Sequence, residues 1–165
     1  MAKAAQNHTQ AQAQALAEAL HAYGVDSVIL SPGSRNTPLV LAFDSMKDQI
    51  EVHTILDERS AGFFALGRAR ASNGAVVLCC TSGSAGAHYL PAVIEAAQSN
   101  IPLIILSADR PAALHGTCAP QTVPQLDFFK PHTRWSEHIE INDLPSDGNA
   151  MAKLACQAMK SPKEH

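Results

Sequence analysis

The segment AVVLCCTSGS, residues 75–84, decides the fold class of this chain. Residues 75–80 form an unbroken apolar run, and small polar residues follow it directly. Such a run is typical of a strand that is buried on both faces of a parallel sheet. The residues at 81–84 predict a tight turn that leads into a helix over residues 85–98.

The same alternation of strand and helix repeats along the chain. Three more short apolar runs predict strands over residues 27–30, 50–56 and 102–107. Apolar residues at helical spacing predict further helices over residues 15–23, 37–46 and 57–72. Strands that alternate with helices form parallel sheets with right-handed crossovers. The predicted fold class is therefore α/β, a three-layer Rossmann-like parallel sheet with helices on both faces.

The alternation fades after Pro111. Residues 112–129 contain glycine and prolines without helical periodicity, which predicts a long irregular segment over the strand ends. An edge strand is expected over residues 133–141, and a last amphipathic helix over 150–159, capped by Ser146-Asp147. We interpret residues 1–165 as one domain in which residues 1–8 and 161–165 are flexible ends.

Composition narrows the possible function classes. Of the 165 residues, 12 are Lys or Arg and 15 are Asp or Glu, which gives a net charge of −3. Aromatic residues make up only 5%, so neither a basic nucleic-acid surface nor a stacking platform for single strands is expected. No stretch approaches the roughly 20 apolar residues that span a bilayer. The first residues also lack the apolar core of a signal peptide.

Cysteine and histidine spacing predicts neither disulfides nor a metal centre. The four cysteines include no Cys-x-x-Cys pair, and the eight histidines show no spacing typical of zinc ligands. We therefore expect reduced thiols, a cytoplasmic location and no metal ligand within this chain.

Polar residues follow each predicted strand, at the edge where α/β sheets bind ligands. Glu58 comes after the second strand, where it either stabilises a helix start opened by Asp57 or exchanges a proton with a bound heterocycle. Arg35 and Arg110 follow the first and fourth strands, and their side chains are either solvated or placed to bind carboxylates. The turn at 81–84 lacks the glycine spacing of phosphate-binding loops, which favours a simple tight turn. Residue types and positions alone leave these alternatives open.

Five strings together resemble one enzyme family. SPGSRNTPL at residues 31–39 and ADRP at residues 108–111 resemble motifs specific to the 2-succinyl-5-enolpyruvyl-6-hydroxy-3-cyclohexene-1-carboxylate synthase family, thiamine-diphosphate transferases of menaquinone biosynthesis. DERSAGFFALG at residues 57–67 resembles that family's glutamate motif, and the strings at 81–85 and 119–121 follow in the family's order. The resemblance runs from about residue 16 to residue 135. It departs from the family at Ser84, where threonine is common, and at Pro120, where some members have asparagine.

The resemblance implies a role for each matched residue. Glu58 is the implied catalytic residue, which hydrogen-bonds N1′ of the cofactor's aminopyrimidine and promotes loss of the proton at C2. The implied cofactor-binding residues are Glu58, Thr81, Ser82, Gly83 and Gln121. The implied substrate-binding residues, which hold the carboxylates of isochorismate or lie near the bound intermediate, are Ser34, Arg35, Arg110 and Gln121.

The family's enzymes decarboxylate 2-oxoglutarate and add the resulting fragment to isochorismate, and this chain resembles only their N-terminal pyrimidine-binding domain. It contains no Gly-Asp-Gly…Asn-Asn motif, so we expect an isolated N-terminal domain or a truncated gene product. The resemblance implies that Mg²⁺ and the diphosphate are bound by a domain absent from this chain. It also implies a homo-oligomer in which a second subunit completes the site, so that this chain alone is inactive.

Two other interpretations remain open at this stage. The chain is alternatively the pyrimidine domain of another thiamine-diphosphate enzyme, although the strings around Arg35 and Arg110 argue against this. It is alternatively a non-catalytic α/β module that binds a small ligand by itself.

Overall fold

The structure is a computed structural model that describes residues 2–141 and 149–160. Four parallel strands form one sheet in the order β2-β1-β3-β4. The strands are β1 (Ser27–Ser31), β2 (Glu51–Thr54), β3 (Val76–Cys80) and β4 (Leu103–Ser107). The helices are α1 (Ala2–Ala22), α2 (Thr37–Asp44), α3 (Glu58–Ser72), α4 (Leu90–Ser99) and α5 (Asn149–Lys160), with 3₁₀ helices η1 (Gly83–Tyr89) and η2 (Ala112–Leu114).

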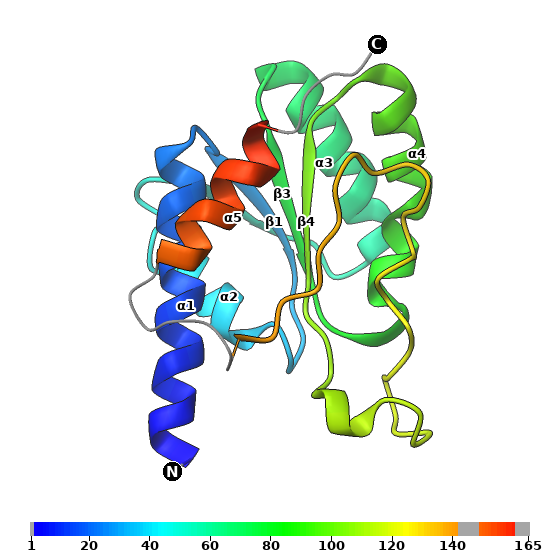
Figure 1. Ribbon diagram of the computed structural model, residues 1–165. Coiled ribbons are helices and arrows are strands. Elements are labelled where there is room, and N and C mark those ends of the chain that lie inside the picture. The colour runs from blue at the N-terminus through cyan, green and yellow to red at the C-terminus, as the bar shows by residue number, and fades with distance from the viewer. Residues whose placement is uncertain (1, 142–148, 161–165) are drawn as a thin grey trace.

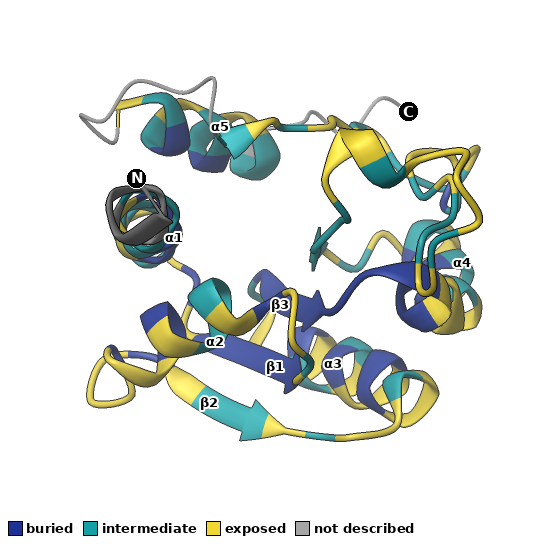
Figure 2. Cartoon of the chain, turned by 90° about the horizontal axis from the view of Figure 1, so that it is seen from below, coloured by how far each residue is buried: buried dark blue, intermediate teal, exposed yellow. Residues whose placement is uncertain are grey.

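Helices cover both faces of the sheet, which confirms the predicted three-layer α/β class (Figure 2). The residues of β1 and β3 are all buried, and they alternate between two apolar clusters. Val28 and Val77 pack toward α1, α2 and α5, whereas Ile29 and Leu78 pack toward α3, η1 and α4. The two central strands are therefore apolar without interruption because each face has its own helical layer.

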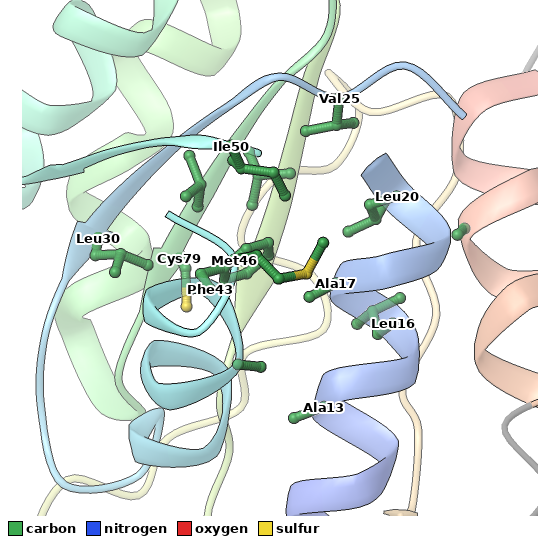
Figure 3. Packing of buried hydrophobic residues seen from close by; sticks show 14 of the residues in the cluster. Ala13, Leu16, Ala17, Leu20, Val25, Leu30, Phe43, Met46, Ile50 and Cys79 are labelled. Carbon is green, nitrogen blue, oxygen red and sulfur yellow. The ribbon is translucent and has the colours of Figure 1, made fainter. Parts of the chain in front are cut away.

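The cluster under α1 and α2 is built from aliphatic side chains around one aromatic ring (Figure 3). Leu16 and Leu20 of α1 lie one turn apart and face Phe43 of α2 and Met46 just beyond it. Phe43 is fully buried, so this layer fixes α2 and the turn that precedes it. None of the described helices is both long and apolar enough to cross a bilayer.

The helix predicted over residues 85–98 differs in its first half. Residues 83–89 form the 3₁₀ helix η1, and the α-helix begins only at Leu90. Pro91, in the first turn of α4, explains the break. Its ring would clash with the carbonyl of residue 87 in a continuous α-helix, whereas a proline is readily accommodated where a helix starts.

The predicted edge strand over residues 133–141 is wrong. Residues 133–140 form no strand, and the sheet ends at β4. Ile139 and Ile141 pack instead against the cluster beneath α1 and α5, so they bury their side chains without pairing with β4. The predicted last helix is confirmed as α5, whereas its predicted cap at Ser146-Asp147 lies outside the described residues.

The buried ionisable groups give the fold a defined pH dependence. Burial is the main cause that raises the pKa of Cys79 to about 12 and that of Cys80 to about 11. Burial also raises the pKa of Tyr89. In an unfolded chain a thiol ionises near pH 8.5 and a tyrosine near pH 10. The unfolded state therefore releases protons that the folded state retains, so stability present below about pH 8.5 is lost as the pH rises.

We expect the free energy of unfolding to fall between about pH 8.5 and pH 11. Each buried thiol contributes up to about 1.4 kcal/mol per pH unit to this fall. Urea unfolding at a series of pH values measures the slope. A variant with Cys79→Ala and Cys80→Ala has lost two of the three buried groups, so its slope should be much shallower. An equal slope in the variant and the parent would contradict the assignment.

Candidate functional site

Because all four strands are parallel, their carboxyl ends lie at one edge of the sheet, and those of β1, β3 and β4 point toward the bottom of Figure 1. Because the strands are parallel, the turns that follow them meet there, as is usual for ligand sites in α/β folds. All the residues singled out from the sequence as site candidates lie in or beside these turns, or in the long segment after β4.

Glu58 is the first residue of α3, and its neighbour Asp57 is the helix cap. The Asp57 carboxylate accepts a hydrogen bond from the Ser60 N–H at 2.8 Å, and this bond lowers the pKa of Asp57. Capping is thus performed by Asp57, which leaves the half-buried Glu58 side chain available for another contact. Glu58 lines a small pocket of about 150 Å³ with Asp57, Arg59 and His88.

The Glu58 carboxylate also acts on the buried end of β3. Its negative charge adds to burial in raising the pKa of Cys80 and of Tyr89. Tyr89 is fully buried, and its hydroxyl donates to the Ser31 Oγ at 3.3 Å. Glu58 therefore lies between solvent and the apolar layer under α3, where a carboxyl group can exchange a proton with a ligand that covers it.

The turn after β1 is held from inside by Asn36, which is fully buried. Its Oδ1 accepts from the Gly33 N–H at 2.8 Å, and its Nδ2 donates to the Ser31 carbonyl at 3.1 Å. Asparagine is a favoured helix cap, yet this one makes no capping bond to α2 and instead closes the turn. The result is a fixed turn from which Ser34 and Arg35 project into solvent.

Arg110 lies in the turn after β4, which is separated from the turn after β1 by strand β3. Its backbone N–H donates to the Asp109 carboxylate at 2.7 Å, and its carbonyl lies 3.2 Å from the His115 Nε2. The Arg110 Nε is buried and has no hydrogen-bond partner within the part of the chain that the structure describes. Ser34, Arg35 and Arg110 are among the many residues that line an open groove of about 1100 Å³, which also extends along β4, α1 and α5.

Between these two regions lies the turn after β3, which is polar and buried. Thr81 is only 9% exposed and Ser82 1%. Their hydroxyl oxygens nevertheless have no hydrogen-bond partner among the described residues. A buried hydroxyl without a partner costs free energy, which a polar ligand would recover. A Cβ on Gly33 would lie 2.6 Å from the Thr81 Cβ, so the two turns fit closely only because residue 33 is glycine. The partnerless hydroxyls thus fit a ligand that brings polar atoms to this turn.

Gly83 and Gln121 bring the long segment onto this turn. The Gln121 Nε2 donates to the Ser82 carbonyl at 3.3 Å. Gly83 has φ 87°, and a Cβ there would meet the Gln121 Cγ at 2.9 Å and its Cα at 3.2 Å. Both the backbone conformation and the close approach therefore require glycine at residue 83.

We expect Gly83→Ala to destabilise the domain by about 2–3 kcal/mol, because the variant adds overlap to an unfavourable backbone conformation. Gly67→Ala is the matched control. Gly67 lies inside α3 with no neighbouring atom within 4 Å of an added Cβ, so alanine should stabilise the helix by about 0.5–1 kcal/mol. Urea unfolding measures both values. A Gly83→Ala variant as stable as the parent would show that the segment does not pack on the turn.

The structure distributes the predicted site residues over three places at the carboxyl-end edge of the sheet. Glu58 lies in the small pocket, Ser34, Arg35 and Arg110 lie on the large groove, and the turn 81–83 with Gln121 lies at the end of the central strand β3. Three further residues were not predicted to belong to the site: His88 beside Glu58, Asn36 within the first turn, and Gln125, which contacts Gly83. The pattern of residues 36–38 gave a signal for Asn36, since asparagine before a helix start is common, but that signal points to a cap. No sequence pattern identifies His88 or Gln125.

Comparison with known proteins matches this chain to one family over most of its length. The family described as "Thiamine pyrophosphate enzyme, N-terminal TPP binding domain" matches residues 11–130. Among similar proteins is a 2-succinyl-5-enolpyruvyl-6-hydroxy-3-cyclohexene-1-carboxylate synthase from Haloquadratum walsbyi, 50% identical over 82% of this chain and 22% of that protein. Proteins of the same name from Lysinibacillus sphaericus and Myxococcus xanthus are 48% and 52% identical, over 84% and 74% of this chain and 25% and 21% of their own lengths. The chain thus spans about a quarter or less of these relatives.

Proposed function

Since the chain belongs to the thiamine pyrophosphate enzymes as an N-terminal TPP-binding domain, we propose that it forms the pyrimidine-binding half of a synthase active site. The reaction proposed is that of its named relatives, 2-succinyl-5-enolpyruvyl-6-hydroxy-3-cyclohexene-1-carboxylate synthesis, a transferase step in menaquinone biosynthesis. The substrates are 2-oxoglutarate and isochorismate, and the location is cytoplasmic. The observation that carries the proposal is that Arg35 and Arg110, from turns far apart in the sequence, line one groove, and that Gln125, which also lines it, accepts a hydrogen bond from the Gly83 N–H.

Thiamine diphosphate, when bound, supplies a nucleophilic carbon and accepts the electron pair that is released as carbon dioxide leaves the 2-oxo acid. Glu58 holds a proton in hydrogen-bonding contact with N1′ of the aminopyrimidine. Two observations support this role: Asp57 and not Glu58 caps α3, and the Glu58 charge acts on the buried Tyr89. The partnerless hydroxyls of Thr81 and Ser82 would donate to or accept from polar atoms of the cofactor, and Gln121 holds the turn through its bond to the Ser82 carbonyl.

Arg35 and Arg110 bind the carboxylates of isochorismate, and Ser34 adds a hydroxyl beside them. A guanidinium group donates two parallel hydrogen bonds to a carboxylate, which fixes the acceptor's orientation as well as its charge. The partnerless Nε of Arg110 supports this role, because it retains a donor that no described residue uses. His115 and Asp109 hold the Arg110 backbone from the other side.

Mg²⁺ and the cofactor's diphosphate belong to a further domain, outside the residues of this chain. Most of the cofactor's affinity then comes from its metal-bridged diphosphate, so this chain alone is inactive and binds the cofactor weakly.

A second subunit completes the site in a homo-oligomer. Two apolar side chains near Glu58 in the sequence are exposed: Leu56 is 77% exposed, and Phe63 on α3 is 46% exposed. Exposed apolar groups of this size next to a polar pocket are typical of a surface that another chain covers.

The test uses the complete enzyme that carries this domain. Release of carbon dioxide from 2-oxoglutarate should depend on thiamine diphosphate and Mg²⁺, and it should rise when isochorismate is added. Turnover with pyruvate as both donor and acceptor would instead identify another thiamine-diphosphate enzyme. Saturable binding of a small ligand without any turnover would support a non-catalytic module.

A further inference from the structure

Strands β3 and β4 separate just beyond their last paired residues. Cys80 is paired with Ser107, and the Ala108 N–H donates to the Cys80 carbonyl at 3.0 Å. After that bond the segments that follow the two strands diverge: the segment after β3 enters the turn 81–83, and the segment after β4 leads to Arg110. No further backbone hydrogen bond joins them within the described residues. Backbone hydrogen bonds therefore do not fix the distance between the turn 81–83 and the turn that contains Arg110.

The link between the two turns is the side chain of Gln125, which comes from the long segment after β4. The Gln125 Oε1 accepts a hydrogen bond from the Gly83 N–H. Its Nε2 donates to the Ala108 carbonyl at 2.9 Å and lies 3.3 Å from the Ser107 Oγ. A primary amide carries the same acceptor and donor as a peptide group. One side-chain amide thus joins the backbones that follow the two strands, as a peptide group does between paired strands.

The Gln125 amide is held in place by the packing of its own segment, residues 121–129. Phe129 is buried in the cluster under α3 and η1, and Phe128 packs partly buried against it. The Phe128 ring lies 3.5 Å from the point where a Cβ on Gly86 would lie, so this segment is seated directly on η1. Gln121, four residues earlier, contacts Gly83. The backbone around Gln125 is therefore fixed at both ends, and its amide is not a free surface group.

We infer that Gln125 is a positioning residue, whose amide extends the β3–β4 ladder by one rung and sets the distance between the turn 81–83 and Arg110. The functional consequence rests on the proposed function: the cofactor contacts Thr81 and Ser82 on one side of this rung, and the acceptor carboxylate contacts Arg110 on the other. The rung therefore keeps the cofactor and the isochorismate carboxylate at a fixed distance from each other. The Gly83 N–H already donates to Gln125, so it does not bind the ligand. Gly83 contributes to the site because the absence of a side chain lets Gln121 approach the turn.

Hydrogen–deuterium exchange in this chain tests the rung without any reaction. Gln125→Met keeps the length of the side chain and removes both hydrogen bonds. We expect the Gly83 amide to exchange at least about 10-fold faster in this variant, because exchange follows local opening. The Ala108 amide, bonded to Cys80, should change by less than about twofold. Equal acceleration at both amides would indicate general loosening, and no change at Gly83 would indicate no rung; either result overturns the inference.

Gln125→Glu separates the two halves of the amide. A carboxylate still accepts from the Gly83 N–H but cannot donate to the Ala108 carbonyl, so Gly83 should remain protected. Thr122→Ala is the control in the same segment, since the Thr122 hydroxyl donates to the nearby Pro120 carbonyl and to no other group among the described residues. Its exchange pattern should equal that of the parent. Loss of Gly83 protection in Gln125→Glu as large as in Gln125→Met would contradict the assignment of Oε1 as the acceptor.

Kinetics in the complete enzyme test the positioning. Gln125→Met should lower kcat/KM for isochorismate by about 10-fold and leave the dissociation constant for thiamine diphosphate within about threefold, because the displaced group is Arg110. Thr122→Ala should leave both unchanged. Faster exchange at Gly83 with unchanged kcat/KM would overturn the positioning role. A parent enzyme without synthase activity would refute the proposed function instead, while the exchange measurement would still decide whether the rung exists.

Discussion

Glu58→Gln in the complete enzyme is expected to lower kcat by about 100-fold or more, the usual scale of a lost acid–base step. Glutamine keeps the shape of the side chain and its hydrogen-bonding reach, but it cannot take up and return a proton. Because Asp57 and not Glu58 caps α3, the substitution leaves the helix start intact. The dissociation constant for thiamine diphosphate should therefore stay near that of the parent.

Glu95→Gln is the matched control for this substitution. Glu95 is an exposed residue of α4, on the same side of the sheet as Glu58, and it lies outside the small pocket. The same loss of a carboxylate there should leave kcat unchanged. A similar kcat in Glu58→Gln and the parent would mean that Glu58 only stabilises the start of α3.

Arg35→Ala should lower kcat/KM for isochorismate while the use of 2-oxoglutarate and the affinity for thiamine diphosphate are preserved. Losing one partner of a buried, hydrogen-bonded charge pair costs about 2–5 kcal/mol, which corresponds to a loss of about 30-fold or more. Arg35 is exposed in this chain, so the full effect requires that the rest of the enzyme covers the groove. The effect belongs to the side chain because Asn36 holds the backbone of the turn independently.

Arg35→Lys separates charge from shape. An ammonium group keeps the positive charge but cannot donate two parallel bonds from a planar fork, so this variant should also be impaired. Arg70→Ala is the control, because Arg70 is exposed in the last turn of α3 and does not line the groove. If Arg35→Ala kept the parent's kcat/KM for isochorismate, the acceptor carboxylate would have to bind elsewhere.

The sheet was predictable because its strands are short, apolar and separated by strong turn residues. The runs ending at Ser31 and Cys80 are buried on both faces, and this burial is what their unbroken apolar pattern indicates. The helix predicted over residues 57–72 is confirmed as α3, which Asp57 caps through a hydrogen bond and which ends at Asn73 with a left-handed backbone. Local chemistry alone fixes these features, so the sequence carries them plainly.

Features set by contacts between distant residues were not predictable in this way. The alternation in residues 133–141 fits a strand, but Ile139 and Ile141 pack against helices, a choice that depends on where α5 lies. Gln125 shows no pattern because its partners, Gly83 and Ala108, are brought to it only by the fold. His88 reaches the Glu58 pocket through the path of η1, which replaced the expected α-helix.

The central claim is that Glu58 moves the proton that activates the bound cofactor. Exchange of the C2 proton of bound thiamine diphosphate for deuterium, measured without substrates, tests this claim most directly because no other step of the reaction contributes. With cofactor bound equally in both forms, Glu58→Gln should exchange about 100-fold more slowly than the parent, and Glu95→Gln should exchange at the parent's rate. Equal rates in Glu58→Gln and the parent would contradict the claim and leave Glu58 as an acidic residue at a helix start.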